Sequence, residues 1–231
     1  MYLPTLNLSE VKRLVLLLPQ PEFNYFSKKL KFLESFKYLG FNFKIYKEGG
    51  LIAGPLFSAP QISFLIEILK EKGLREILAL GWAGKLPSSP LQLGDLFLPV
   101  RAISLEGTSR FYYKRKKNFS LNKNIKKRIE EELLNFGLIC KSGGIISVDV
   151  PWRVEKSLNM FNFYLSEGWA LDMETSALYA VSRFFGLKAV MLTFITDEIG
   201  RSINRRPEDL LQEKREKLLY FMEDFLDRGF I

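Results

Sequence analysis

Residues 187–200 read LKAVMLTFITDEIG, and this stretch decides how the rest of the chain is interpreted. The run from Ala189 to Ile195 is almost continuously apolar, which is typical of a strand buried on both faces of a mainly parallel sheet. Thr196 and Asp197 follow directly from the end of that strand. Because ligands of such sheets bind at the carboxyl ends of the strands, Asp197 is a candidate functional acid. The alternative is that Asp197 only caps the turn that follows.

Short apolar runs alternate with longer segments of helical periodicity along the whole chain. The apolar runs predict further strands at Val15–Leu18, Phe41–Tyr46, Ile77–Leu80, Asp95–Ile103 and Leu138–Ser147. The predicted helices are Glu22–Leu39, which Gly40 would close, Ala59–Lys72, Asn124–Phe136, Met173–Phe185 and residues 207–228. Strands joined by crossover helices predict an α/β fold with a mixed, mainly parallel central sheet flanked by helices. No repeat, low-complexity tract or linker divides residues 1–231, so we expect one domain.

Two small counts exclude much catalytic chemistry, because the 231 residues include no His and a single Cys, Cys140. Without His there is no Ser-His-Asp triad, no Cys-His pair and no His-ligated zinc. One Cys forms neither an internal disulfide nor a thiolate metal cluster, so we expect a cytoplasmic protein without a metal. The apolar run Leu14–Leu18 is far shorter than the roughly 20 residues that span a bilayer, so no membrane segment is expected. Catalysis would therefore depend on carboxylates, amines, guanidinium groups, hydroxyls and backbone amides.

The net charge of +8 is concentrated in one segment. Nine Lys or Arg residues and no acid lie between Arg110 and Arg128, so the rest of the chain is close to neutral. Phe111, Tyr112 and Phe119 are interleaved with these cations, as in proteins that bind single-stranded nucleic acid. A solvated loop and helix face is the more common outcome of such a charge run, and we favour it over nucleic-acid binding.

A pair of acids lies at the start of a predicted helix, where Asp172 and Glu174 flank Met173. Acids in a first helical turn commonly interact only with the helix dipole. A glutamate at that place can also accept hydrogen bonds from a diol. The predicted strands end at Pro19–Glu22, Gly81–Gly84, Ser147–Arg153 and Thr196–Gly200, where we expect a site to form.

Several motifs occur in a fixed order between about residues 15 and 200. They are GP (54–55) with APQ (59–61), LGWAG (80–84), LGDL (93–96), EGTS (106–109), SVD (147–149) with WR (152–153), LDMETSALYAV (171–181), GLKAV (186–190) and TDE (196–198). Taken together they resemble the nucleoside phosphorylase family, which holds purine and uridine phosphorylases and the related nucleosidases. The predicted helix over residues 207–228 lies beyond the resemblance.

The resemblance implies an enzyme that cleaves the bond between a ribose and a nucleobase. Matched to the family's motifs, Glu174 holds the ribose hydroxyls and Met173 packs against the sugar. Asp197 matches the acid that protonates the departing base in purine-cleaving relatives, which is general acid catalysis. The presence of that acid favours a purine-type nucleoside as substrate.

The resemblance also implies a pocket for the base and a pocket for phosphate or water. The base-binding candidates are Trp152, Asp172 and Arg153, with Trp152 one place beyond the usual aromatic position. The candidates for the phosphate or water pocket are Gly81, Trp82, Thr108 and Glu22.

The chain departs from the family at the phosphate. Ala79 stands where several relatives have a phosphate-binding Arg, and Trp82 stands where they have Ser or Thr. Loss of a bidentate guanidinium removes a strong phosphate ligand. The possible substitutes are the amides of residues 81–84, Lys85, Arg101 or an Arg from a neighbouring subunit. Hydrolytic relatives carry a glutamate near the end of the first strand that activates water, and Glu22 lies close to that position. Alternatively, Glu22 is only an acid in the first turn of the helix that starts there.

We therefore expect a nucleoside phosphorylase, a pentosyltransferase of nucleotide salvage, with inorganic phosphate as co-substrate and no cofactor. Hydrolysis by water that Glu22 activates is the close alternative, and an inactive family member is a third. Because active sites in this family lie near subunit contacts, we expect a homo-oligomer, either a dimer or a hexamer of dimers. The expected partners are a nucleoside and phosphate, without a membrane or nucleic acid.

Overall fold

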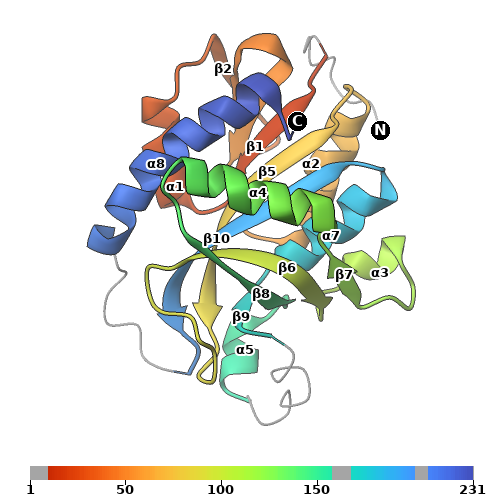
Figure 1. The fold of residues 1–231 in the computed structure, drawn as a ribbon. Coiled ribbons are helices and arrows are strands. Elements are labelled where there is room, and N and C mark those ends of the chain that lie inside the picture. The colour runs from red at the N-terminus through yellow and green to blue at the C-terminus, as the bar shows by residue number, and fades with distance from the viewer. Residues whose placement is uncertain (1–9, 158–167, 201–207, 231) are drawn as a thin grey trace.

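The computed structural model describes residues 10–157, 168–200 and 208–230, and it confirms a mixed α/β fold (Figure 1). Its strands are β1 (Arg13–Leu17), β2 (Glu34–Tyr38), β3 (Phe41–Ile45), β4 (Gly50–Gly54), β5 (Glu76–Lys85), β6 (Leu96–Ser104), β7 (Asn118–Ser120), β8 (Cys140–Ser147), β9 (Ala170–Asp172) and β10 (Lys188–Glu198). Its α-helices are α1 (Gln20–Lys29), α2 (Ala59–Lys70), α3 (Ser109–Tyr112), α4 (Lys123–Asn135), α5 (Pro151–Glu155), α7 (Thr175–Phe184) and α8 (Glu208–Arg228), with a 3-10 turn, η1, at Lys47–Gly49.

The described strands form one mixed sheet in the order β10-β6-β8-β9-β5-β1-β4-β3-β2, and β7 pairs with β6. Its longest paired stretches are parallel and join β5 to β10 and β6 to β8. Antiparallel pairing joins β2 to β3 and β3 to β4 at one edge. The sheet is therefore mixed, with parallel pairing at its centre.

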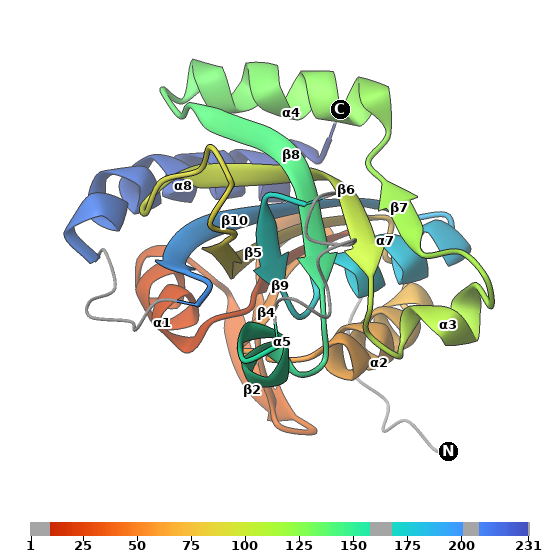
Figure 2. The ribbon, with the colours of Figure 1, turned by 90° about the horizontal axis from the view of Figure 1, so that it is seen from below.

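Five strands of this sheet close into a ring, because β5 pairs with both β9 and β10. From β10 the path runs through β6, β8 and β9 back to β5. Figure 2 shows these strands between α4 and β2. The ring brings the end of β10 and the beginning of α7 into one neighbourhood.

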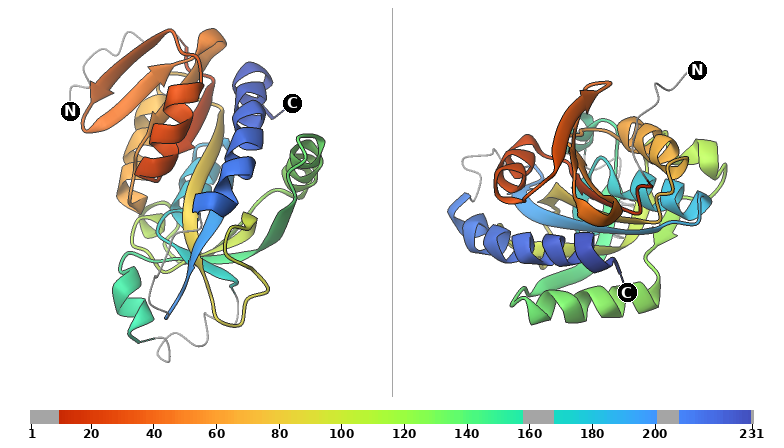
Figure 3. Two further views of the ribbon diagram at one scale, coloured as in Figure 1. Left: turned by 90° about the vertical axis from the view of Figure 1, so that its left-hand side faces the viewer. Right: turned by 90° about the horizontal axis from the view of Figure 1, so that it is seen from above.

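The central strands are apolar throughout because helices cover both faces of the sheet. In β1, Leu14 and Leu16 pack into the core that α2 and α7 cover, whereas Val15 and Leu17 pack against α1, α4 and α8. The same alternation runs through β5 and β10, since successive side chains of a strand point to opposite faces. Figure 3 shows α4 and α8 along the same face. A continuous apolar run such as Ala189–Ile195 is thus buried on both sides, as predicted.

The helix predicted over Glu22–Leu39 is wrong in its second half. The helix α1 ends at Lys29, and residues 34–38 form β2, which pairs with β3 from Tyr38 opposite Phe41 to Glu34 opposite Ile45. Leu39 and Gly40, with φ of 48° and 85°, form the two-residue turn between them. Positive φ at both positions is the turn that matches the twist of a hairpin, so Gly40 closes a hairpin and not a helix.

The basic segment is largely a solvated surface. Lys126, Lys127 and Arg128 pair with glutamates four residues further along α4, at 3.5, 3.7 and 2.9 Å. Phe119 is fully buried, and Tyr113 packs against it. These contacts favour the solvated helix face over a stacking platform for nucleic acid. Within the described part of the chain, no helix is long and apolar enough to cross a membrane.

The hairpin turn offers a test of this fold. Leu39 is 54% exposed and is held at positive φ, which disfavours a branched apolar residue and suits Asn. We expect Leu39→Asn to raise the free energy of unfolding by about 0.5–1 kcal/mol in urea denaturation. Leu33→Asn is the control, because Leu33 is 76% exposed and lies outside the turn. An equal effect of the two substitutions would contradict the assigned turn.

Candidate active site

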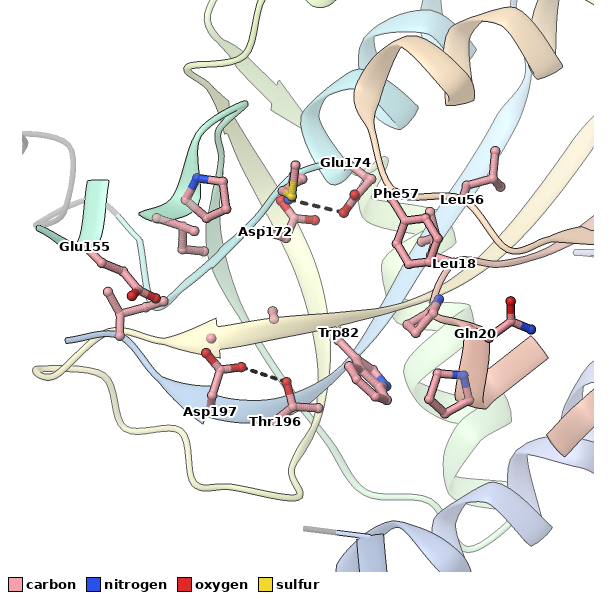
Figure 4. Close-up of a pocket in the computed structure, with 18 of the residues that line it drawn as sticks. Leu18, Gln20, Leu56, Phe57, Trp82, Glu155, Asp172, Glu174, Thr196 and Asp197 are labelled. Atoms are coloured by element: carbon pink, nitrogen blue, oxygen red, sulfur yellow. Dashed lines mark hydrogen bonds between the residues drawn. The ribbon is translucent and has the colours of Figure 1, made fainter. Parts of the chain in front are cut away.

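A cavity of about 760 Å³ opens at the carboxyl ends of β1, β4, β5 and β10 (Figure 4). The strand ends predicted to form a site converge there, together with the start of α7. The residues that line it are Leu18, Pro19, Gln20, Pro21, Asn24, Leu56, Phe57, Trp82, Ala83, Gly84, Pro151, Glu155, Leu171, Asp172, Met173, Glu174, Thr196, Asp197 and Ile199.

Asp197 reaches the cavity through an irregularity in the β5–β10 ladder. Ile195 pairs with Ala83 and Asp197 pairs with Gly84, so Thr196 is an extra residue that locally disrupts the register. The Thr196 hydroxyl donates a hydrogen bond to Asp197 Oδ1 at 2.8 Å. A Cβ on Gly84 would lie 2.9 Å from Asp197 Oδ2 and 2.5 Å from Ile199 Cδ1. The missing side chain at Gly84 therefore leaves the space that the carboxylate of Asp197 occupies.

Asp172 and Glu174 lie across the cavity from Thr196 and Asp197 (Figure 4). Asp172 Oδ1 accepts a hydrogen bond from the Ser147 hydroxyl at 2.5 Å, and its Oδ2 accepts bonds from the amide and hydroxyl of Thr175. Both oxygens of Asp172 are thus used to attach the start of α7 to the end of β8. Glu174, 9% exposed, accepts from the Met173 amide at 3.2 Å within the described residues.

Burial raises the pKa of both acids, and the charge of Asp172 adds to the shift of Glu174. Burial raises the pKa of Asp172 to about 6, against the lowering effect of its Ser147 and Thr175 donors. Burial, followed by the negative charge of Asp172, raises the pKa of Glu174 well above its usual value. On the other wall, burial and the charge of Asp197 raise the pKa of Glu155. The cavity therefore disfavours additional negative charge.

The base-binding candidates are only partly brought together. Asp172 lines the cavity, but its oxygens are engaged in holding α7. Trp152 is 73% exposed, Arg153 is exposed, and neither lines the cavity. Pro151 and Glu155 do line it, because residues four apart share one face of a helix, and the three residues between them do not line it. The i, i+4 spacing of Pro151 and Glu155 is the sequence signal that could have identified Glu155.

The candidates for the phosphate or water pocket are dispersed. Trp82 lines the cavity, whereas Gly81 is buried in β5 and Thr108 lines a second cavity with Glu67 and Asp149. The segment 81–84 is not a turn, since it continues β5 in register with β10. Successive amides of a strand point to opposite edges and do not converge on one anion, so this segment does not form the predicted cradle.

Glu22 does not face the cavity. Its carboxylate is fully buried and accepts two hydrogen bonds from Arg215 of α8, at 2.9 and 2.6 Å, and one from the Trp82 indole at 3.0 Å. A carboxylate so enclosed has no contact with water in the cavity. The predicted role of Glu22 as the base that activates water is thus contradicted by its position.

The described part of the cavity wall carries acids and no cation. Glu155, Asp172, Glu174 and Asp197 line it, and none of its described lining residues is Lys or Arg. Lys85, one of the predicted phosphate ligands, pairs with Glu198 at 3.2 Å. Among the described residues there is also no group of three or more His, Cys, Asp or Glu side chains that could hold a metal ion. Phe57, Gln20 and Asn24 are further lining residues that no sequence motif marked.

Solved structures from two bacteria have a similar fold. A 5′-methylthioadenosine/S-adenosyl homocysteine nucleosidase from Helicobacter pylori is 18% identical with a TM-score of 0.74, covering 94% of this chain and 99% of that one. Futalosine hydrolase of H. pylori is 19% identical with a TM-score of 0.74, covering 94% and 97%. AMP nucleosidase from Bacteroides thetaiotaomicron is 19% identical with a TM-score of 0.75, covering 95% and 90%. At these identities the likeness establishes the fold.

Curated relatives match part of the chain. DeoD-type purine nucleoside phosphorylases from Alkaliphilus metalliredigens and Bacillus cereus are 23% and 24% identical over 155 residues, which is 64% of this chain. The match spans 64% and 63% of the length of these relatives, slightly under two thirds. The model of the phosphorylase superfamily matches residues 13–227, nearly the whole chain. The chain therefore belongs to the phosphorylase superfamily.

Proposed function

We propose that this chain is a nucleosidase that hydrolyses the N-glycosidic bond of a purine-type nucleoside. The observation that carries the proposal is the cavity wall, which has four carboxylates and, among the described lining residues, no cation. A phosphate dianion would find no guanidinium or ammonium among these residues to bind it. Water carries no charge and needs no such ligand.

The names of similar proteins agree on the substrate class and divide on the nucleophile. The solved structures of similar fold are named nucleosidases and a hydrolase, and the curated relatives are named phosphorylases. The resemblance to the family favours phosphorolysis, and these curated relatives keep it as the second candidate. Phosphorolysis requires phosphate and hydrolysis does not, so one assay with and without phosphate distinguishes the two reactions.

The positions of the carboxylates support a division of roles. Asp197 would donate its proton to a ring nitrogen of the base as the bond to C1′ breaks and the bonding electrons pass to the base. Glu174, across the cavity, would accept hydrogen bonds from the ribose hydroxyls and stabilise the positive charge that develops on the sugar. Water then adds to C1′ and gives up a proton to a cavity carboxylate, which leaves free base and ribose. The purine preference, the homo-oligomer and the cytoplasmic location stay predictions.

Base release without phosphate is the first prediction. Purified protein is incubated in phosphate-free buffer with adenosine, inosine, guanosine, 5′-methylthioadenosine, uridine and AMP, and free base is measured by chromatography. We expect release from a purine nucleoside at a rate that added phosphate leaves unchanged. Release that requires phosphate would establish a phosphorylase and overturn the proposal.

The second prediction concerns Asp197. Asp197→Asn removes the proton donor and keeps the size of the side chain, so we expect kcat to fall by about 10²–10⁴-fold. Glu198→Gln is the matched control, because Glu198 is the next residue on β10 but pairs with Lys85 and does not line the cavity. Similar losses in both variants would show that the strand end, and not the acid, is required.

The third prediction is a pH dependence. If ionised Glu174 stabilises the sugar cation, activity rises with pH as Glu174 loses its proton. Because the pKa of Glu174 is raised, this rise lies above pH 4.5, the usual pKa of a glutamate. Asp172→Asn removes the neighbouring charge, so the acidic limb of kcat/KM should move to lower pH. Glu155→Gln, which removes a cavity carboxylate outside this pair, should leave that limb in place. A limb that Asp172→Asn does not move would contradict the coupling.

A further inference from the structure

A buried ion pair reaches from the C-terminal helix to the wall of the cavity. Arg215 of α8 and Glu22 of α1 are 5% and 0% exposed, and the guanidinium binds both carboxylate oxygens. A bidentate pair of this kind fixes the carboxylate in orientation as well as in position. The ring of Tyr25, with its centroid 5.6 Å from the guanidinium carbon, packs against the other end of the pair.

The oriented carboxylate holds one residue of the cavity. Glu22 Oε1 accepts a hydrogen bond from the Trp82 indole nitrogen at 3.0 Å. Trp82 lines the cavity, whereas Glu22 and Arg215 do not. Figure 4 shows Trp82 on the same side of the cavity as Thr196 and Asp197. Because the indole N–H is directed to Glu22, the part of Trp82 left for a ligand is its apolar ring surface.

We propose that Trp82 is a substrate-contacting residue, and that Glu22 and Arg215 are positioning residues that hold its indole ring against the nucleoside. The inference rests on the proposed function and deepens it. The surface of an indole ring can stack against an aromatic base, as aromatic side chains do in proteins that bind single-stranded nucleic acid. A large ring is useful in this way only if its orientation is fixed before the substrate binds, since ordering it later would cost affinity.

The pair itself is a costly way to stabilise a fold. Removing two charges from water carries a desolvation cost, and replacing a buried pair by apolar residues is often neutral or stabilising. Removing one partner alone leaves an unpaired buried charge and is strongly destabilising. The test therefore changes both residues together.

The experiment is a double-mutant cycle on the full-length protein. One arm is Glu22→Leu with Arg215→Met, which removes the acceptor of the indole N–H without stranding a charge. The other arm is Trp82→Phe, which keeps an aromatic ring and removes the N–H. The substrate is the purine nucleoside that the wild-type protein cleaves fastest. KM and kcat are measured for the wild type, for each arm and for the combination of both arms, and circular dichroism confirms that each protein is folded.

We expect the Glu22→Leu/Arg215→Met variant to raise KM by about tenfold while kcat changes less than threefold. In the Trp82→Phe background the same change should leave KM within twofold, because the residue that it positions is already altered. Glu22→Gln with Arg215→Met keeps an acceptor for the indole and should restore part of the lost affinity. Additive effects on KM, or an equal loss with Gln and Leu at position 22, would overturn the inference.

The inference and the proposed function fail in different ways. Additive KM values in an active protein overturn the positioning role and leave hydrolysis standing. If no nucleoside is cleaved, the proposed function fails, and the same cycle is measured by the quenching of tryptophan fluorescence on titration with adenine. Non-additive dissociation constants for adenine would then support the positioning role. Additive constants, or no binding of adenine at all, would overturn it.

Discussion

The parallel pairing of β5 with β10 is the constraint on which the rest of the structure depends. The two strands pair from Glu76 opposite Lys188 to Lys85 opposite Glu198, with one register shift at Thr196. Their interior residues are apolar because helices cover both faces. The pairing also closes the ring of strands that brings β9 and α7 beside β10. The β5–β10 pairing places the cavity residues of both strands, which are residues 82–84 of β5 and residues 196–197 of β10. The disruption at Thr196 then turns Asp197 into the space that Gly84 leaves open.

The electrostatics of the cavity follow from which carboxylates have a charged partner. Glu22 is a neighbour in sequence of the cavity residues Pro21 and Asn24, but its carboxylate is paired with Arg215. It also accepts a hydrogen bond from Trp82 and does not line the cavity. Asp172 and Glu174 have hydroxyl and amide donors as their described partners, so burial raises the pKa of each. Lys126, Lys127 and Arg128 instead form surface pairs along α4, and Lys85 pairs with Glu198. A site built in this way suits a neutral nucleophile and a substrate whose reacting centre becomes positive.

Much of the fold could be predicted because its elements carry strong local patterns. The buried run Ala189–Ile195 and the amphipathic segment ending at Gly137 were assigned to the correct element types. The hairpin was missed because Gly40 after an apolar segment is equally consistent with a helix end, and only pairing with β3 distinguishes the two. Residues 81–84 were interpreted as a turn because of their two glycines, although Gly84 serves to make room for Asp197. At the site, the motifs marked Asp197 and Glu174, which line the cavity. They did not show that Trp152 points away from it, because that depends on side-chain direction. They also did not show that Glu22 pairs with Arg215, which is 193 positions away in the chain.

The origin of the oxygen that reaches C1′ tests the central claim most directly. The protein is incubated with its best nucleoside in ¹⁸O-enriched water that also contains millimolar phosphate, and the sugar product is analysed by mass spectrometry. Attack by water in the acid-lined cavity predicts free ribose and no ribose 1-phosphate. Because the anomeric oxygen of free ribose itself exchanges with water, the absence of ribose 1-phosphate is the diagnostic result. Ribose 1-phosphate without the heavy isotope on C1′ would show that phosphate enters the cavity, and would contradict a site that excludes anions.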